Sequence, residues 1–384
     1  MIIDYKMVAT TLSGFEEILA KELLNLGARN IKVKNRAVEF IGDLGFMYKA
    51  NLNLRTAIRI LKPIFNFEAK DEIELYSKIY SIDWTRYINI SNTFSINTSG
   101  NSNIFKHSKY TSLKSKDAIV DFFRDKYGKR PSIDLESPDI KINLHVRDDK
   151  FTVSLDSSGD SLHKRGYKLA NVKAPISEVF AASLILASDW NRNFDFYDPM
   201  CGSGTFLIEA AMIAFNIPSN IFRDKFSFEN WSDYNPQLWE KIKHHSLEKE
   251  VSFNGKILGT DNSYNAIRIA KSNVKNALME ENIEVRNQDF FSSSTSKNTH
   301  VIFNPPYGER MPILVEDFYK KIGDTLKQKY QGCTVWIISS DIENIKMIGL
   351  KPSKKIKVFN GRLECRFLKF EIYEGSKKRS KNNT

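Results

Sequence analysis

The feature that most constrains the fold is a regular alternation of strand-like and helix-like segments after Gly166. An alanine-rich helix is predicted over residues 177–189. Strands are predicted over 194–197, 256–260, 283–287, 300–303 and 334–339, and the helices between them over 205–215, 266–279 and 315–330. This alternation predicts an α/β fold on a doubly wound parallel sheet, in which ligands bind beyond the carboxyl ends of the strands.

Two segments depart from the alternation. Residues 354–359 and 364–373 are both strand-like and are separated by Asn360-Gly361, which is a strong hairpin signal. We therefore expect the sheet to finish with an antiparallel strand. Residues 217–251 interrupt the series with tryptophans and turn residues, and we interpret them as an insertion over the carboxyl edge of the sheet.

The first half of the chain has a different organisation. Residues 1–60 predict a small α+β unit of the split βαβ kind, with strands at 7–10, 31–33 and 37–40 and helices at 13–26 and 44–51. Residues 60–155 are mixed, with strands at 94–97, 140–146 and 151–155 and a helix at 112–127 that is followed by Gly128.

Positive charge is concentrated in this half. The net charge of the chain is +11. Residues 101–130 hold the basic side chains Lys106, Lys109, Lys114, Lys116, Arg124, Lys126, Lys129 and Arg130 and only three acids, Asp117, Asp121 and Asp125. Such a surplus is typical of a surface that binds a phosphate backbone, although a solvated helix face explains it as well. The basic residues 377–384 predict a flexible tail.

Several classes of protein are disfavoured. The apolar runs are far shorter than the ~20 residues that span a bilayer, and the N-terminus has acids where a signal peptide has its apolar core. Three scattered cysteines predict neither a disulfide framework nor a zinc site. We expect a cytoplasmic protein without a membrane segment or a bound metal.

The turn after the first predicted strand carries the sharpest motif, Asp198-Pro199-Met200-Cys201-Gly202-Ser203-Gly204-Thr205. Its small residues let the backbone approach a ligand and leave amides free at the start of a helix. Leu207 occupies the third glycine position of a dinucleotide fingerprint, and the lysine of a phosphate loop is absent. An acid directly before the glycines suits a cationic ligand better than a pyrophosphate.

Further candidate residues end the next three strands. Asp261 is placed to accept the hydroxyls of a ribose, and Asp289 to accept from an adenine amino group, with Phe290 packing on the ring. Each acid could cap a helix instead. After the fourth strand, Asn304-Pro305-Pro306-Tyr307 predicts a rigid turn. An amide oxygen and a free carbonyl there can hold an exocyclic amine, and a tyrosine can stack on a flipped base.

In their order, these motifs resemble those of class I methyltransferases that act on amino groups. The longer runs His163-Lys164-Arg165-Gly166-Tyr167, Ala174-Pro175, Asn304-Pro305-Pro306-Tyr307-Gly308-Glu309-Arg310 and Asn360-Gly361-Arg362-Leu363-Glu364-Cys365 are similar to those of a narrower family. These are the THUMP-domain methyltransferases that make N2-methylguanine in large-subunit ribosomal RNA, many of which carry the label of N6-adenine-specific DNA methylases.

The resemblance covers nearly the whole chain and implies its organisation. It implies a ferredoxin-like unit at 1–60, a THUMP RNA-binding domain at 61–160 and a Rossmann-like class I methyltransferase domain at 161–376, before the tail at 377–384. It implies S-adenosylmethionine as the cofactor and RNA, in ribosomal RNA or an assembling large subunit, as the partner. Because the second methyltransferase of the bacterial fusion enzymes does not fit in this length, we expect a single activity.

The expected site residues fall into three groups. The cofactor is expected to contact Pro175, Asp198, Met200, Cys201, Gly202, Gly204, Thr205, Asp261, Asn262, Asp289 and Phe290. The amine is expected to contact Asn304, Pro305, Pro306 and Tyr307. RNA is expected to contact Lys106, Lys109, Lys114, Lys116, Arg124, Lys129, Arg130, Arg165 and Arg310.

The implied chemistry is direct attack of the amine on the sulfonium methyl group, which depends mainly on positioning and needs neither a metal nor an enzyme nucleophile. Methylation of cytosine C5 would need a cysteine thiolate instead. Three functions stay open at this stage: a guanine-N2 methyltransferase acting on RNA, an adenine-N6 methyltransferase acting on RNA or DNA, and a non-enzymatic RNA-binding factor in ribosome assembly.

Overall fold

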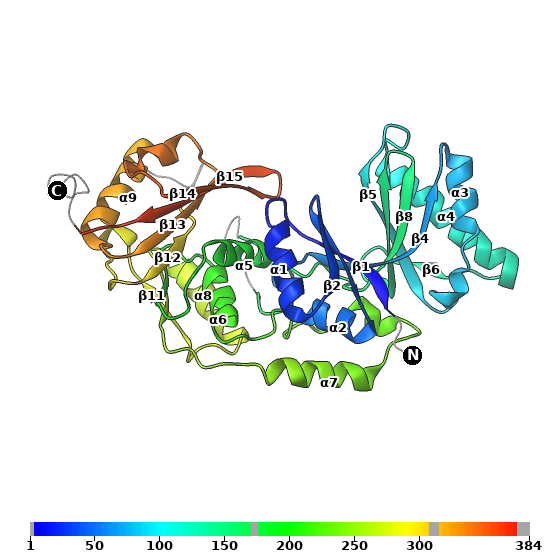
Figure 1. Ribbon diagram of the computed structural model, residues 1–384, viewed down its shortest axis with the longest axis horizontal. Helices are drawn as coiled ribbons and strands as arrows, with labels where there is room; N and C mark the ends of the chain where they lie inside the picture. Colours follow the sequence, from blue (N-terminus) through cyan, green and yellow to red (C-terminus); the bar gives the residue numbers. More distant parts are fainter. Residues whose placement is uncertain (1–3, 170–175, 307–314, 375–384) are drawn as a thin grey trace. The chain divides into compact units, whose positions relative to one another are not determined.

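The computed structural model describes residues 4–169, 176–306 and 315–374. The chain divides into two compact units (Figure 1). The N-terminal unit comprises Met1–Thr11, Leu19–Leu162 and Arg223–His245, and the C-terminal unit comprises Leu12–Ile18, His163–Phe222 and Ser246–Thr384. Each unit is built on one β-sheet.

The first part of the N-terminal unit has the predicted split βαβ order. Its elements are β1 (Tyr5–Thr10), α1 (Glu16–Leu26), β2 (Arg29–Lys34), β3 (Ala37–Gly42), α2 (Leu44–Asn53) and β4 (Arg59–Glu68). The strands lie in the order β2-β3-β1-β4 and all pair antiparallel, which is the ferredoxin-like arrangement. The carboxylate of Asp43 caps α2 by accepting from the amide of Phe46 at 2.7 Å.

The same sheet continues beyond β4 into the second part of the unit. There it runs through β8 (Lys150–Asp156), β7 (Ile140–Arg147), β5 (Thr93–Asn101) and β6 (Ser132–Ile133). The helices α3 (Glu72–Tyr80) and α4 (Ser108–Tyr127) pack on one another, and α4 packs on β5. The strand predicted at 140–146 is confirmed as β7, in which the alternate residues Ile140, Ile142, Leu144 and Val146 are all buried. The predicted domain boundary at residues 60 and 61 lies inside β4, which this sheet shares between its two parts.

Most of the expected insertion belongs to a different unit from the one that the sequence suggested. Residues Arg223–His245, with η2 (Ser227–Asn230) and most of α7 (Pro236–Leu247), are part of the N-terminal unit, although they interrupt the C-terminal unit in sequence. Aromatic packing is the physical reason. The ring of Tyr48 stacks on Phe228 with centroids 4.4 Å apart and meets Trp239 edge-on at 5.9 Å.

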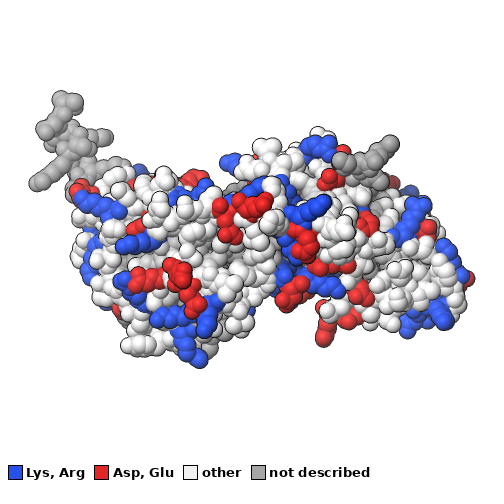
Figure 2. Space-filling model, turned by 90° about the horizontal axis from the view of Figure 1, so that it is seen from below, with Lys and Arg blue, Asp and Glu red and all other residues white. Residues whose placement is uncertain are grey.

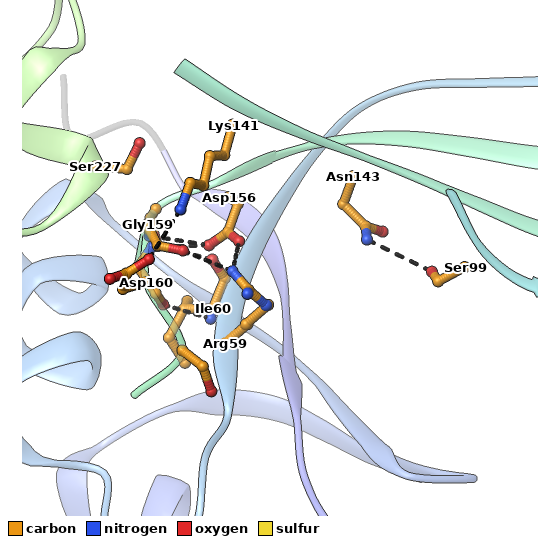
Figure 3. A network of polar contacts seen from close by, with 12 residues as sticks. Arg59, Ile60, Ser99, Lys141, Asn143, Asp156, Gly159, Asp160 and Ser227 are labelled. Atoms are coloured by element: carbon orange, nitrogen blue, oxygen red, sulfur yellow. Dashed lines mark hydrogen bonds and ion pairs between the residues drawn. The ribbon is translucent and has the colours of Figure 1, made fainter. Parts of the chain in front are cut away.

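A polar network closes the end of β8 (Figure 3). Arg59 of β4 points at Asp156, with which it forms an ion pair, and donates to the carbonyl of Gly159 at 2.6 Å. The carboxylate of Asp156 also accepts from the amide of Ser158 at 3.0 Å. Burial raises the pKa of Asp156, and the guanidinium of Arg59 opposes that rise.

The C-terminal unit has the predicted α/β architecture (Figure 1). Its strands are β9 (Phe196–Asp198), β10 (Ile257–Asp261), β11 (Ile283–Asn287), β12 (His300–Phe303), β13 (Thr334–Ser339), β14 (Lys354–Asn360) and β15 (Leu363–Glu371). They lie in the order β11-β10-β9-β12-β13-β15-β14. The first five pair in parallel, and β15 is antiparallel to both of its neighbours, as predicted for the end of the sheet.

Helices cover both faces of this sheet. They are α5 (Glu178–Ala187), α6 (Thr205–Ala214), α8 (Tyr264–Asn276) and α9 (Val315–Lys329), with short turns η3 (Phe290–Ser292) and η5 (Asn344–Ile348). Neighbouring residues of one strand enter different cores: Ile302 packs with α5, α6 and α8, whereas Val301 and Phe303 pack with α9. The final hairpin turns at Gly361-Arg362, one residue later than the predicted Asn360-Gly361, because Asn360 still pairs with Leu363.

None of the helices in the described ranges combines the length and the apolar character that crossing a bilayer requires.

The ion pair at the end of β8 yields a stability prediction. Arg59→Leu leaves the buried carboxyl of Asp156 without its guanidinium, so the free energy of unfolding should fall by about 2–3 kcal/mol. Lys150→Leu removes an ion pair with Glu68 in which both side chains are exposed, and it should change the free energy by less than about 0.5 kcal/mol. Urea denaturation of the two variants checks this, and equal losses would contradict it.

Candidate active site

The sheet of the C-terminal unit changes winding direction beside β9. From β9 the chain proceeds to β10 and β11 on one side and then crosses to β12 on the other side. Loops diverge at such a switch point and leave a crevice beyond the carboxyl ends of the strands. Strand pairing sets Asp198 level with Gly259 and Asp261 level with Asn287, so the predicted strand-end acids share this edge.

The glycine turn between β9 and α6 has the backbone conformation that its sequence requires. Gly202 has φ 54° and Gly204 has φ 80°, in the left-handed region that other residues rarely adopt. A Cβ atom at Gly204 would lie 3.3 Å from the Cβ of Ala270 on α8. Gly204 caps α6 without any side-chain hydrogen bond in the described residues, so amides at the start of α6 remain for a ligand.

Asp198 is the most buried acid of the site, with 1% of its surface exposed. Its Oδ1 accepts from the amide of Met200 at 3.1 Å. Burial raises the pKa of Asp198 well above its ordinary value, and the nearby carboxylate of Asp261 raises it further. A cationic ligand would relieve both effects, so the donor set fits a positively charged group.

Of the other two strand-end acids, Asp289 caps a short helix, as the alternative interpretation allowed, whereas Ser263 and not Asp261 caps α8. Half-buried Asp261 accepts from the amide of Ser263 at 2.9 Å and, through its second oxygen, from Gly202 at 3.0 Å. The latter bond ties the end of β10 to the glycine turn. Exposed Asp289 caps η3 by accepting from Phe291 at 2.6 Å. Carboxylates have about four acceptor sites, so these bonds leave capacity for a ligand.

The predicted packing of Phe290 on an adenine ring is contradicted. Its side chain is 3% exposed and lies in the core beneath α9, with its ring 5.3 Å from that of Phe303 and 5.6 Å from that of Tyr330. A side chain enclosed in this way cannot also cover a bound base.

The turn that begins with Asn304-Pro305-Pro306, which we expect to hold the target amine and call the amine turn, follows β12 at the same edge. Pairing of Val301 with Tyr197 places the end of β12 beside the end of β9. Beyond Phe303, Asn304 is half-buried, Pro305 is buried and Pro306 is half-buried. Tyr307 and Arg310 lie outside the described residues, as does Pro175.

Comparison with known proteins identifies the family. Residues 165–369 match the model described as "RMKL-like, methyltransferase domain", residues 69–156 match the THUMP domain and residues 6–61 match the RlmL ferredoxin-like domain. The chain belongs to the RMKL-like methyltransferase family. Its C-terminal unit is therefore a class I methyltransferase domain, and ferredoxin-like and THUMP modules precede it, as the family resemblance implied.

Individual relatives agree with this assignment. "Putative RNA methyltransferase slr0064" of Synechocystis sp. is 38% identical over 95% of this chain and 96% of its own length. "Ribosomal RNA large subunit methyltransferase K/L" of Shewanella frigidimarina is 36% identical over 98% of this chain but 54% of its own length, so the chain spans about half of that protein. The crystal structure of SMU.472, "a putative methyltransferase complexed with SAH", has a TM-score of 0.86 at 31% identity and covers 98% of this chain and 100% of that chain.

The remaining predicted contacts of the cofactor turn differ in exposure. Cys201 and Thr205 are buried, Met200 is half-buried and Asn262 is exposed. Burial raises the pKa of the Cys201 thiol well above its ordinary value, and the carboxylate of Asp198 adds to the rise. The side chain is therefore a thiol at neutral pH, which disfavours a role as a nucleophile.

The basic residues of α4 in the THUMP module are less uniform than the sequence suggested. Lys116 pairs with Asp117, Arg124 pairs with Asp121 at 3.2 Å, and Lys114 lies 5.3 Å above the ring of Tyr76. Exposed basic residues without an ion pair in the described chain gather beside the two ends of the helix: Lys106, Lys109, Lys129 and Arg130. Figure 2 likewise shows acidic and basic side chains interspersed over the visible face.

The predicted RNA contact of Arg165 disagrees with the structure. Its side chain is 0% exposed, forms an ion pair with Glu209 at 3.4 Å and donates to Asn220 at 3.1 Å. A guanidinium enclosed in this way is held inside the methyltransferase domain, so it has no surface to offer a phosphate.

Sequence reasoning missed the polar residues behind the glycine turn. Glu209 of α6 forms an ion pair with Arg165 and accepts a hydrogen bond from the hydroxyl of Tyr167 at 3.0 Å. Asn273 of α8 donates to the carbonyl of Ser203 at 3.0 Å. Their signal was present, because a Glu inside the apolar run 205–214 and an Asn on the inward face of the helix each need a buried partner.

Because Arg165 is buried between fixed partners, we predict that the planar shape of its guanidinium contributes more to stability than its charge does. Arg165→Lys keeps the charge but cannot reach Glu209 and Asn220 together, so the free energy of unfolding should fall by about 1–3 kcal/mol. Thermal or urea unfolding checks this. A variant as stable as the natural protein would show that the buried contacts contribute nothing.

Proposed function

We propose that this chain transfers a methyl group from S-adenosylmethionine to the exocyclic N2 of a guanine in RNA, in ribosomal RNA of the large subunit or in an assembling large subunit. One observation carries the proposal. The switch point beside β9 brings three strand-end acids and the Asn304-Pro305-Pro306 turn to the same edge of one sheet. That edge is where an α/β sheet binds its ligands.

The residues present fit the proposed cofactor by charge. S-adenosylmethionine has cationic sulfonium and amino groups, a carboxylate, ribose hydroxyls and an adenine. Buried Asp198 suits a cationic group, and the amides at the start of α6 suit the carboxylate. Asp261 and Asp289 retain acceptor capacity for the ribose and the adenine amino group. When bound, the cofactor supplies an electrophilic methyl group.

The chain's own contribution is to hold the target amine. The side-chain oxygen of Asn304 and the carbonyl of Pro305 can each accept one N–H of an exocyclic amine. These two bonds orient the nitrogen lone pair out of the plane of the base and toward the methyl group. The prolines keep the turn rigid, and the proton leaves after transfer, so catalysis rests mainly on positioning.

The proposal that the substrate is guanine N2 in RNA is supported by the relatives. Relatives that cover most of the chain are named for RNA and for ribosomal RNA of the large subunit, and residues 69–156 match the THUMP model. We assign RNA binding to the region 61–160, between the ferredoxin-like unit at 1–60 and the methyltransferase domain at 161–376. The same amine turn would serve adenine N6, so nucleoside analysis of RNA modified in vitro decides the base. N2-methylguanosine supports the proposal and N6-methyladenosine overturns it.

Asn304 provides the sharpest test of the amine turn. Asn304→Ala removes an acceptor for the target amine, so methyl transfer should fall by about 100-fold or more. Affinity for S-adenosylhomocysteine should stay within about twofold, because the cofactor is assigned to β9, β10 and β11. Transfer of a radiolabelled methyl group and calorimetry provide the two measurements. An active variant would exclude Asn304 from the reaction.

Asp198 gives a prediction about pH. Below its raised pKa the free site holds a proton on Asp198, which a cationic cofactor must expel. The affinity for S-adenosylmethionine should therefore rise with pH and become constant above that pKa. Asp198→Asn should lower the affinity about 10–100-fold and abolish the rise. Asp195→Asn is the matched control just before β9, where Asp195 accepts from the backbone amide of Lys256 at 2.8 Å. Calorimetry across a pH series should give this control the same affinity, and the same rise of affinity with pH, as the natural protein.

The free basic residues near the ends of α4 give a prediction about salt. Replacing Lys129 and Arg130 with serine should weaken RNA binding and make the slope of log K against log salt shallower by about 1.4–1.8. The same replacement at Lys32 and Lys34, two exposed lysines of β2, should leave the slope unchanged. Filter binding over a salt series measures both. Equal slopes in the two variants would show that Lys129 and Arg130 are only solvated and do not bind RNA.

A further inference from the structure

The inner face of α8 contains a buried amide in apolar surroundings. Asn273 has 0% of its surface exposed and lies one turn from Ala270, on the face of α8 that packs into the core behind the glycine turn. Asparagine is a weak helix former, and a buried amide without partners costs several kcal/mol. A residue of this kind is expected only where its hydrogen bonds offset that cost.

Both ends of the amide of Asn273 make such bonds. Its Nδ2 donates to the carbonyl of Ser203 at 3.0 Å, and its Oδ1 accepts from the amide of Leu169 at 3.0 Å. The two partners fix the orientation, because only the NH2 group can donate to a carbonyl and only the oxygen can accept from an amide. One side chain therefore joins two segments that lie far apart in the sequence.

The first of these segments is the glycine turn. Ser203 stands between Gly202 and Gly204, two residues with positive φ, directly before the start of α6. Glycines give a turn little stiffness of their own. Described contacts hold the turn on both sides of Ser203: Gly202 donates to Asp261 at 3.0 Å, and Gly204 donates to the carbonyl of Cys201 at 2.8 Å.

The second segment, residues 165–169, is anchored independently of the glycine turn. Arg165 and Tyr167 both bind Glu209 of α6. Asn276, one turn after Asn273, donates to the carbonyls of Gly166 at 3.2 Å and Tyr167 at 2.9 Å. The amide of Leu169 is thus presented to Asn273 by a segment that α6 and α8 hold in place.

We propose that Asn273 is a positioning residue of the cofactor site. By holding the carbonyl of Ser203 against the anchored 165–169 segment, it fixes the direction of the backbone amides of the glycine turn and of the first turn of α6. The cofactor then binds to amides that are already in place, and less ordering is required on binding. This inference rests on the proposed cofactor site at the glycine turn.

The test compares two asparagines of the same helix. Asn273→Asp keeps the size of the side chain and the acceptor for Leu169, but it presents an oxygen to the carbonyl of Ser203. Asn276→Asp makes the same chemical change one turn later, against the carbonyls of Gly166 and Tyr167, and touches nothing in the glycine turn. Asn273→Ala and Asn276→Ala repeat the comparison should an aspartate variant fail to fold.

Affinity for S-adenosylhomocysteine is measured by calorimetry, steady-state kinetics give KM for S-adenosylmethionine and kcat, and thermal unfolding without cofactor reports stability. At pH 8 we expect Asn273→Asp to weaken binding at least tenfold and to raise KM by a similar factor, with kcat changed less than threefold. We expect Asn276→Asp to change affinity less than twofold, even where it lowers the unfolding temperature as much. Equal affinity losses in both variants, or no loss at Asn273, would overturn the inference.

Asp198→Asn separates the inference from the proposed site. If Asp198→Asn weakens cofactor binding and Asn273→Asp does not, the inference fails and the cofactor site stands. If neither variant alters affinity, the proposed cofactor site at the glycine turn fails, and the inference fails with it.

Discussion

The site depends on a buried carboxylate at the point where a parallel sheet changes direction. Asp198 follows two buried residues of β9, and its pKa is raised because water is excluded around it. An isolated buried charge is costly, so a carboxyl in this position is either neutral or paired with a cation. The amide of Met200 donates to this carboxylate, and the bond from Gly202 to Asp261 ties the glycine turn that follows it to the end of β10, so a cationic cofactor would complete the surroundings of Asp198.

The sequence predicted the sheet well because burial on both faces leaves a simple signal. The strands at 300–303 and 334–339 occur with the expected bounds, since central parallel strands are short apolar runs between turn residues. The site was predictable for a related reason. In an α/β fold, residues that directly follow successive strands reach one edge, so Asp198, Asp261, Asp289 and Asn304 could be grouped without coordinates.

What the sequence could not predict depends on contacts between distant segments. The segment Arg223–His245 interrupts the methyltransferase domain in sequence, yet Phe228 and Trp239 pack on Tyr48 of the N-terminal unit. Periodicity within a segment cannot show which apolar surface it will cover. The same limit applies to Phe290. Its position after a strand suggested a base-stacking residue, but its side chain packs in the core with residues of α9.

The sequence also does not show which charged residues are paired or buried in the fold. Arg165 belongs to a basic run that resembles an RNA contact, but its buried side chain binds Glu209 and Asn220 inside the domain. Lys116 and Arg124 increase the basic count of α4, although acids on the same helix pair with them. A charge count therefore measures composition, whereas binding depends on the charges that remain unpaired.

The buried polar groups behind the glycine turn are explained by the backbone that they hold in place. The turn needs glycines because Gly202 and Gly204 have positive φ and α8 approaches Gly204 closely, and those glycines cannot make the turn rigid by themselves. Rigidity has to come from neighbours that hydrogen-bond its backbone. Asn273 and Asp261 do so from two different elements, which explains why a buried amide persists in a helix that apolar residues would stabilise more simply. A binding loop built from flexible residues thus requires buried polar residues around it, and a sequence reveals them as polar side chains on otherwise apolar faces.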